Sequence, residues 1–105
     1  MKFKTSSSNY LEIMKDKFAK SKNPREALLL SKAYFKEGDY KSAEKWALTA
    51  NKLNNGLEES WLLFAKSKVK LGKRDEAVNI LASYYKRSHS IEVKRLIGQI
   101  KTGKL

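Results

Sequence analysis

Hydrophobic residues recur along this chain mainly at intervals of three and four positions, the spacing that places them on one face of an α-helix. Between residues 9 and 21 they form one such stripe, made of Tyr10, Ile13, Met14 and Phe18. Long stretches lack helix breakers, because the chain has one proline and five glycines. The pattern predicts an all-α protein with helices at about residues 9–21, 24–37, 41–54, 58–71, 74–87 and 90–101.

Polar residues and glycines mark where several of these helices begin and end. The segment Asn23–Glu26 reads Asn-Pro-Arg-Glu, which predicts a capping box with proline in the first helical position. The segment Asn9–Glu12 has the same spacing from cap to glutamate and predicts the start of the first helix. Gly38 and Gly72 stand where a helix should end in a left-handed conformation, and Asp39 can then cap the next helix.

The pattern occurs twice in succession along the chain. Residues 24–57 align with residues 58–91 without a gap. Repetition at a fixed period of this size predicts stacked helix pairs that bury a common core between neighbours. The identical pairs are Leu28/Leu62, Leu29/Leu63, Lys32/Lys66, Lys36/Lys70, Gly38/Gly72, Ala43/Ala77 and Lys52/Lys86.

The first copy contains the segment Ala33–Ala43, which resembles the core of the tetratricopeptide repeat (TPR), where Tyr precedes a Gly-Asp-Tyr turn and a small Ala follows. The second copy keeps the Gly-to-Ala spacing in Val69–Ala77, and Trp61 stands at the family's early tryptophan. The resemblance implies an α-solenoid of antiparallel helix pairs, about six helices in a right-handed superhelix. Small residues also provide room where paired helices should cross: Ser31, Ala43, Ala47, Ala50, Ala65 and Ala77.

The second copy departs from the family pattern towards its end. Lys68 stands where the family has a large Tyr, Tyr84 stands where it prefers Ala, and Arg87 replaces the leucine seen as Leu53 in the first copy. The second repeat is therefore degenerate towards its C-terminus, where the helix at residues 74–87 should pack against the last helix.

The domain organisation follows from the repeats. We expect one TPR-like domain over residues 9–105, preceded by a flexible N-terminus at residues 1–8. The repeats occupy about 24–57 and 58–91, with capping helices at 9–21 and 90–101. Apolar residues cover much of the circumference of the last helix, so it either caps the array or meets a second subunit, and a homodimer through the terminal helices stays open.

Composition limits the compartment and the class of ligand. The chain has no cysteine, which excludes disulfides and thiolate metal sites. Residues 1–8 lack the apolar segment of a signal peptide, and no apolar run approaches the roughly 20 residues that span a bilayer, so we expect a cytoplasmic protein. The net charge of +12 should attract polyanions. Nucleic acid is a weaker expectation than acidic protein, because Lys greatly outnumbers Arg.

No set of residues predicts catalysis, a metal site or a cofactor. His89 is the single histidine and stands in an expected loop between two serines, where a surface role is far commoner than a general base. Gly38 and Gly72 are isolated and form no phosphate-binding loop. We therefore expect a binding protein and not an enzyme.

The TPR resemblance also implies a binding surface, because the first helices of the repeats line a concave groove. At the corresponding positions lie paired lysines beside apolar side chains, which suit an acidic, partly apolar protein segment. Two alternatives stay open: a basic helical protein associated with nucleic acid, and a small homodimeric structural component of a secretion or pilus assembly. The predicted groove residues are Arg25, Leu28, Lys32, Phe35, Lys36, Glu59, Leu62, Lys66, Val69 and Lys70.

Overall fold

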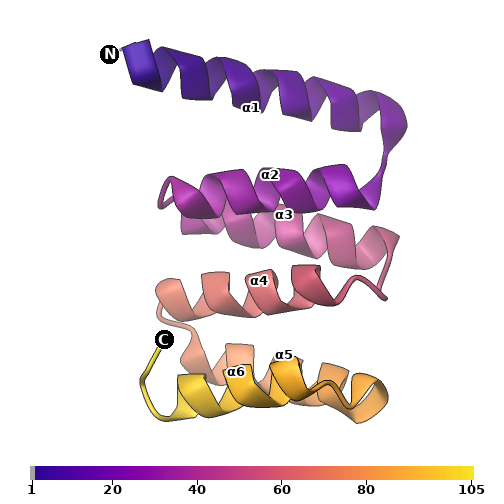
Figure 1. Ribbon diagram of the computed structural model, residues 1–105, viewed down its shortest axis with the longest axis vertical. Coiled ribbons are helices and arrows are strands. Elements are labelled where there is room, and N and C mark those ends of the chain that lie inside the picture. Colours follow the sequence, from indigo (N-terminus) through magenta and orange to yellow (C-terminus); the bar gives the residue numbers. More distant parts are fainter. Residues whose placement is uncertain (1) are drawn as a thin grey trace.

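The computed structural model describes residues 2–105, and side chains from residue 9 onwards. Over this range the chain forms six helices joined by short turns, with no strand (Figure 1). Successive helices run in opposite directions, and their stacking gives a body of 40 × 29 × 18 Å. The helices are α1 (Lys2–Ser21), α2 (Pro24–Lys36), α3 (Tyr40–Leu53), α4 (Glu58–Lys70), α5 (Arg74–Ser88) and α6 (Ile91–Lys101).

The helix predictions are confirmed from α2 onwards to within one residue at each end. The start of α1 was wrong: the helix begins at Lys2, so Asn9 lies inside it and does not cap it. A residue able to cap starts a helix only where the preceding backbone is not helical. The flexibility expected of residues 1–8 stays a prediction, since Met1 and the side chains of residues 2–8 lie outside the described part of the structure.

The N-caps of α2 and α3 lie at the residues that the sequence predicts. Asn23 accepts a hydrogen bond from the backbone N–H of Arg25, as an N-cap should. The predicted capping box is wrong, because Glu26 does not accept a hydrogen bond from the N–H of Asn23. Glu26 accepts one from the Ser21 hydroxyl at 2.5 Å, and the N–H of Asn23 donates to the oxygen of that hydroxyl. Asp39 caps α3 as predicted, by accepting from the N–H of Ser42.

One glycine turn joins the two helices of each repeat, α2 to α3 and α4 to α5. Gly38 and Gly72 have φ of +82° and +81°, the left-handed conformation that the sequence predicted. After α2, the N–H of Gly38 donates to Phe35 and that of Asp39 to Tyr34, and the turn after α4 repeats this pattern. These bonds satisfy the last helical carbonyls while the chain reverses direction.

Small residues allow the paired helices to cross closely. Ser31 of α2 is fully buried and its hydroxyl donates to the backbone carbonyl of Ala43 in α3 at 2.6 Å. One repeat later Ala65 of α4 and Ala77 of α5 are also fully buried. Larger side chains fill the space on either side of these crossings. One core cluster includes Met14, Phe18, Ala27, Leu28, Leu30 and Ala50, and the other includes Ala65, Ala77, Leu81, Tyr84, Val93, Leu96 and Ile100.

The three departures from the TPR pattern are accommodated by polar and aromatic contacts. Lys68 is buried, and its ammonium lies 2.6 Å from Glu44 and 3.0 Å from Glu76. Tyr84 stacks on Trp61 with ring centroids 5.2 Å apart. Arg87 lies over the Tyr84 ring and donates to a backbone carbonyl in the turn before α4. The degenerate end of the second repeat therefore packs through side chains that the family pattern does not contain.

Candidate protein-binding surface

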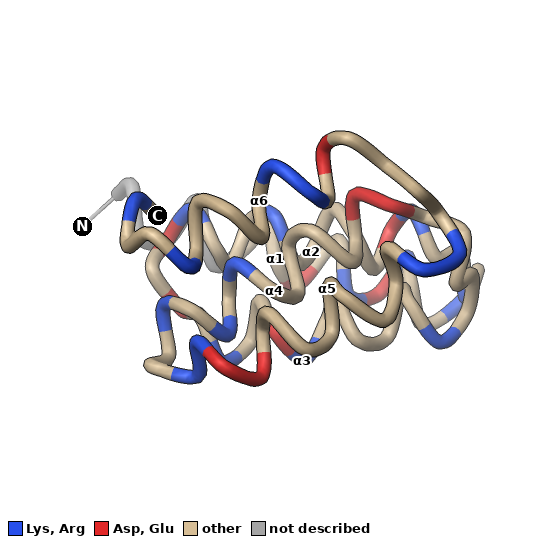
Figure 2. The backbone as a smooth tube through the Cα atoms, turned by 90° about the horizontal axis from the view of Figure 1, so that it is seen from below, with Lys and Arg blue, Asp and Glu red and all other residues tan. Residues whose placement is uncertain are grey.

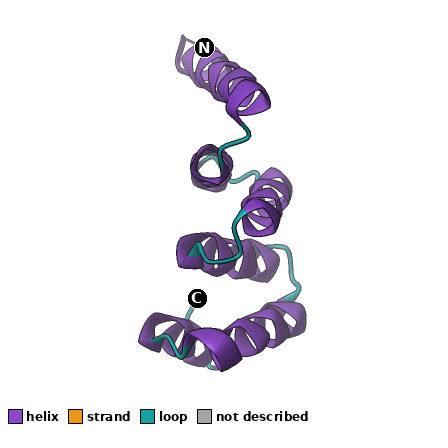
Figure 3. Cartoon of the chain, turned by 90° about the vertical axis from the view of Figure 1, so that its right-hand side faces the viewer, coloured by secondary structure: helices purple, strands orange, loops and turns teal. Residues whose placement is uncertain are grey.

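Three helices, α2, α4 and α6, form one layer of the molecule, and α3 and α5 form the other (Figure 3). Contacts between α2 and α4 and between α4 and α6 confirm that the three lie side by side. We call the outward side of this layer the first-helix face. It is the counterpart of the groove predicted from the sequence.

The predicted groove residues differ in how far solvent reaches them. Leu28 is only 6% exposed and belongs to the core cluster that contains Met14 and Phe18 of α1, so it offers little surface to a ligand. The apolar groove residues of α4 are half-buried, because both pack against the second core cluster. Exposed are Arg25, Lys32, Lys36, Glu59 and Lys70; half-buried are Phe35, Leu62, Lys66 and Val69.

One of the four paired lysines already has a partner within the chain. Lys32 of α2 and Glu59 of α4 lie 2.5 Å apart, and both side chains are about half exposed. This ion pair links the two repeats across the first-helix face. Among the four paired lysines, Lys36, Lys66 and Lys70 therefore have no ion-pair partner within the described residues.

Aromatic rings lie beside the basic end of the face. Phe35 packs edge-on against Tyr40, with ring centroids 5.1 Å apart. The ammonium of Lys70 lies 5.8 Å from the centroid of the Tyr40 ring. Since α2 and α4 run in the same direction, their last turns bring Lys36 and Lys70 to the same end of the face.

The last helix, which the sequence analysis treats as a capping helix, extends the face. Aligning Leu62 of α4 with Arg95 of α6 also places Lys66 on Gln99 and Ala65 on Gly98. Gly98 is exposed, whereas Ala65 is fully buried, because α6 has no following helix across it within the described residues. Helix α6 therefore takes the position of the first helix of a third repeat. This register is one residue shorter than the interval between the first two copies, and the turn before α6 is the one where His89 adopts φ +53°.

A hollow of about 140 Å³ lies between α4 and α6 on this face. Half-buried Leu62 supplies apolar surface, and Lys66 and Arg95 supply positive charge. Leu96 also lines the hollow but is only 4% exposed. Arg95 also lies 3.2 Å from Glu92 in the preceding turn. The hollow thus combines apolar and basic groups contributed by two helices.

Positive charge is not confined to the first-helix face. In Figure 2, Lys and Arg positions are distributed over the helices, with Asp and Glu between them.

Among the described residues, no group of three or more His, Asp and Glu side chains could hold a metal ion. His89 is exposed and packs edge-on against Tyr85. In this same part of the chain, no helix has the length and apolar character needed to cross a membrane.

Six antiparallel helices, four of them paired through small-residue crossings and glycine turns, define a helical-repeat protein of the TPR type in the described part of the chain. The family model described as anaphase-promoting complex, cyclosome, subunit 3 matches residues 8–84. The match covers more than half of the chain, so the protein belongs to this family of TPR-type repeats. No curated protein sequence matches the chain significantly.

Proposed function

We propose that this protein is an interaction module that holds an acidic, partly apolar segment of a partner protein along the first-helix face and so helps to assemble a larger complex. The observation that carries the proposal is the hollow between α4 and α6, where Leu62 lies beside Lys66 and Arg95. An amphipathic segment with acidic flanks matches both properties of this site.

The two kinds of contact have different roles in this proposal. Exposed ion pairs typically contribute about 0.2–1 kcal/mol each, so Lys36, Lys66 and Lys70 alone give weak binding. Their larger effect is to attract and orient an acidic partner. Burial of apolar side chains against Leu62 and Val69 then supplies most of the affinity.

The family supports this class of function. TPR-type repeats mediate contacts with partner proteins, and the family description names a subunit of a multi-protein complex. Assembly with other proteins is the shared element that we extend to this chain. A cytoplasmic location is part of the same proposal.

A matched pair of charge-reversal variants tests the surface. The first changes Lys36, Lys66 and Lys70 to Glu, and leaves out Lys32 because its reversal would set two carboxylates against each other at Glu59. The control changes three exposed lysines of α3 to Glu and so has the same net charge: Lys41, Lys45 and Lys52.

The probe is a labelled helical peptide with leucines at every third or fourth position and glutamates between them, followed by fluorescence anisotropy. We expect the first-helix variant to bind at least about tenfold more weakly than wild type and the α3 variant to bind nearly as wild type does. Equal loss in both variants would show a general charge effect and refute the surface. Circular dichroism checks that all three proteins are equally helical.

A random DNA duplex serves as the second probe, because net charge alone also predicts attraction to nucleic acid. We expect a dissociation constant above about 10⁻⁴ M at physiological salt, which is weaker than typical non-specific association. Tighter binding that both variants lose equally would favour the nucleic-acid alternative over a protein partner.

A further inference from the structure

The turn between α5 and α6 carries a serine that links three helices. Ser90 is the N-cap of α6, and its hydroxyl oxygen accepts a hydrogen bond from the N–H of Val93 at 3.3 Å. The same hydroxyl donates to the carboxylate of Glu58, in the first turn of α4, at 2.8 Å. The hydroxyl of Tyr84, from α5, lies 3.4 Å from the other oxygen of that carboxylate. We call Glu58, Tyr84 and Ser90 the α4–α6 junction.

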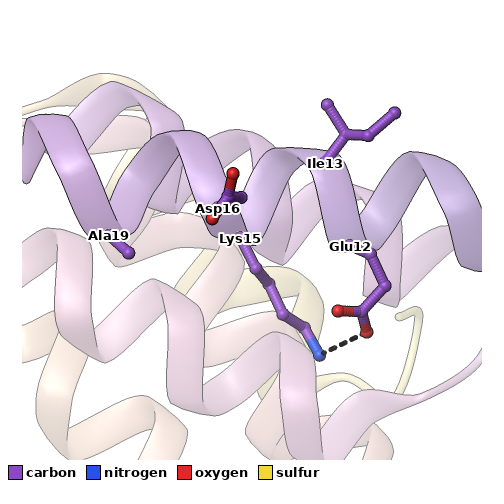
Figure 4. Close-up of a pocket in the computed structure, with 5 residues that line it drawn as sticks. All are labelled: Glu12, Ile13, Lys15, Asp16 and Ala19. Carbon is purple, nitrogen blue, oxygen red and sulfur yellow. Dashed lines mark ion pairs between the residues drawn. The ribbon is translucent and has the colours of Figure 1, made fainter.

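The carboxylate of the junction is held by neutral hydroxyl groups. Several other carboxylates of the chain lie beside a cation, as Glu12 does beside Lys15 at 3.6 Å (Figure 4). None of the ion pairs among the described residues includes Glu58. Its charge acts on the neighbouring phenol, since burial and then the negative charge of Glu58 raise the pKa of Tyr84 above 10.0. A second anion at the junction would therefore meet a carboxylate that has no cation paired with it.

The junction lies at one end of the hollow between α4 and α6. Leu62 lines this hollow from the turn of α4 that follows Glu58, and Arg95 lines it from α6. Because α4 and α6 run in the same direction, both helices begin at the junction (Figure 1). In the part of the chain that the structure describes, the bond from Ser90 to Glu58 is the single hydrogen bond between α4 and residues 90–101. The spacing of the two helices, and with it the hollow, therefore depends in part on this bond.

The residues around Ser90 suit a protein kinase that selects basic sequences. Lys86 and Arg87 precede this serine by four and three positions, and an apolar residue, Ile91, follows it. Charge patterns of this kind are one way in which kinases select substrates. Ser90 itself is half-buried, but His89 adopts φ +53° in an exposed turn, where a chain opens locally at low cost. The exposed residues on either side of Ser90 are Lys86, Arg87, His89 and Ile91.

We propose that phosphorylation of Ser90 is a switch that loosens α6 from α4 and so weakens binding at the first-helix face. Its effect on binding rests on the proposed function, whereas its effect on α6 does not. In the reaction, the Ser90 Oγ forms a bond to the γ-phosphorus of ATP while the bond from that phosphorus to the β-phosphate oxygen breaks. ADP leaves, and the hydroxyl proton passes to a carboxylate of the kinase. The phosphoserine carries a charge of about −1.5 to −2 at neutral pH, and the proton that Ser90 donates to Glu58 is gone.

Two effects of the phosphate oppose each other at this place. The N-terminus of α6 attracts an anion, but the helix dipole offers only about half an elementary charge. Glu58 repels the phosphate with a full charge at close range, in a half-buried place that solvent screens poorly. Arg87 is already engaged, since its guanidinium lies over the Tyr84 ring and donates to the carbonyl of Asn55. Repulsion therefore exceeds attraction, and the start of α6 should move away from α4.

Charge substitutions at position 90 test the switch without a kinase. Ser90→Asp adds a negative charge, and Ser90→Asn is its neutral control, because aspartate and asparagine cap helices about equally well. We expect the urea midpoint of Ser90→Asp to lie at least about 0.5 M below that of Ser90→Asn. In a Glu58→Gln background this difference should vanish or reverse, since only the attraction of aspartate to the helix dipole remains. A difference of the same size and sign in both backgrounds overturns the proposal.

Hydrogen exchange shows which helix responds. The amide of Leu96 in α6 should exchange at least about fivefold faster in Ser90→Asp than in Ser90→Asn, and the amide of Leu30 in α2 should exchange equally in both. Equal exchange at Leu96 also overturns the proposal. Because Leu30 lies in the other core cluster, a change at both amides would mean general destabilisation and would count against a local switch.

Peptide binding connects the switch to the first-helix face. The acidic leucine-containing peptide should bind at least about fivefold more weakly to Ser90→Asp than to Ser90→Asn. Ser83→Asp adds the same charge at an exposed serine of α5 and should bind nearly as wild type does. Equal weakening by the two aspartates would refute the switch. A wild-type chain that does not bind the peptide refutes the proposed function instead, and the urea and exchange results still decide whether α6 is released.

The modification itself is tested with ATP and a purified calmodulin-dependent protein kinase, which selects serines that follow an arginine by three positions. Mass spectrometry should place a phosphate on Ser90, and Ser90→Ala should lose it whereas Ser88→Ala retains it. The phosphorylated chain should show the lower urea midpoint and the faster exchange in α6. Absence of phosphate at Ser90, or a phosphorylated chain as stable as the unmodified one, overturns the proposal.

Discussion

The buried ammonium of Lys68 offers the sharpest test of how the second repeat holds together. Its side chain is 10% exposed, that of Glu44 is 17% exposed, and 2.6 Å separates the two charged groups. The change Lys68→Met keeps an unbranched apolar stem, one atom shorter, near Phe64 but removes the charge. Glu44 is then left with a carboxylate that is largely shielded from water.

The cost can be estimated from this geometry. Removing one partner of a fully buried ion pair typically costs about 3–5 kcal/mol. Glu44 keeps some contact with water, so we expect Lys68→Met to lower the free energy of unfolding by about 2 kcal/mol. Adding Glu44→Leu removes the stranded charge, and the double variant should return to within about 1 kcal/mol of wild type. Glu76→Gln should cost clearly less than Lys68→Met, because the Glu76 side chain is 61% exposed.

The effect should depend on pH. The hydrogen bond from Lys68 and its positive charge hold the pKa of Glu76 below its ordinary value of 4.5. This contribution to stability is therefore present above that value and is lost as the pH falls through the lower pKa of the folded state. Burial lowers the pKa of Lys68, but its hydrogen bonds to Glu44 and Glu76 outweigh burial and raise it above 10.5. That contribution is present below the ordinary lysine pKa and is lost as the pH rises through the higher folded value.

Urea unfolding followed by circular dichroism at about 25 °C measures all three variants. The difference between wild type and Lys68→Met should be full near neutral pH and should shrink as the pH falls through the lowered pKa of Glu76. A loss smaller than about 0.5 kcal/mol at neutral pH, the range of an ordinary surface change, would refute the reasoning. So would a double variant that is less stable than Lys68→Met alone.

Other changes test the turns, caps and core by the same urea assay. Gly72→Ala should lower the free energy of unfolding by about 1 kcal/mol, because alanine must then adopt a backbone φ of +81°. Gly98→Ala should raise it by about 0.5–1 kcal/mol, because position 98 lies within a helix and an added Cβ meets nothing within 4 Å. Equal effects of the two changes would contradict the assigned turn. Asp39→Ala should lower the free energy of unfolding by about 1 kcal/mol, because it removes the N-cap of α3. Asp39→Asn should lower it by much less, because asparagine can still cap the helix. Leu30→Ala should cost about 2–5 kcal/mol because Leu30 is fully buried, and a loss below about 1 kcal/mol would contradict its place in the core.

Much of the fold could be predicted because it depends on interactions that are local in the sequence. The spacing of apolar residues predicted all six helices. Gly38 and Gly72 predicted the turns, since a residue in the left-handed conformation ends a helix whatever packs around it. The repeat interval gave the pairing of helices. The small residues Ser31 and Ala65 gave the crossings, which the structure confirms by their complete burial.

Predictions that depended on neighbours distant in sequence were less successful. Nothing in the local sequence places Glu44 beside Lys68 or Glu59 beside Lys32, because each pair joins different helices. The capping box failed for a related reason: the hydroxyl of Ser21, beyond the turn, offers Glu26 another partner.

The candidate surface divides in the same way. Helical spacing alone determined that Lys66 and Lys70 would share one face of their helix with Leu62 and Val69, since residues on one side of a helix stay together in any packing. The TPR resemblance was needed to predict that Lys36, which lies on another helix, joins the same face. Only the tertiary structure decided that Leu28 is buried, that Lys32 is paired with Glu59, and that α6 adds Arg95 and Gln99 to the face. Burial and pairing depend on which helices lie next to one another, and that arrangement is a property of the folded chain.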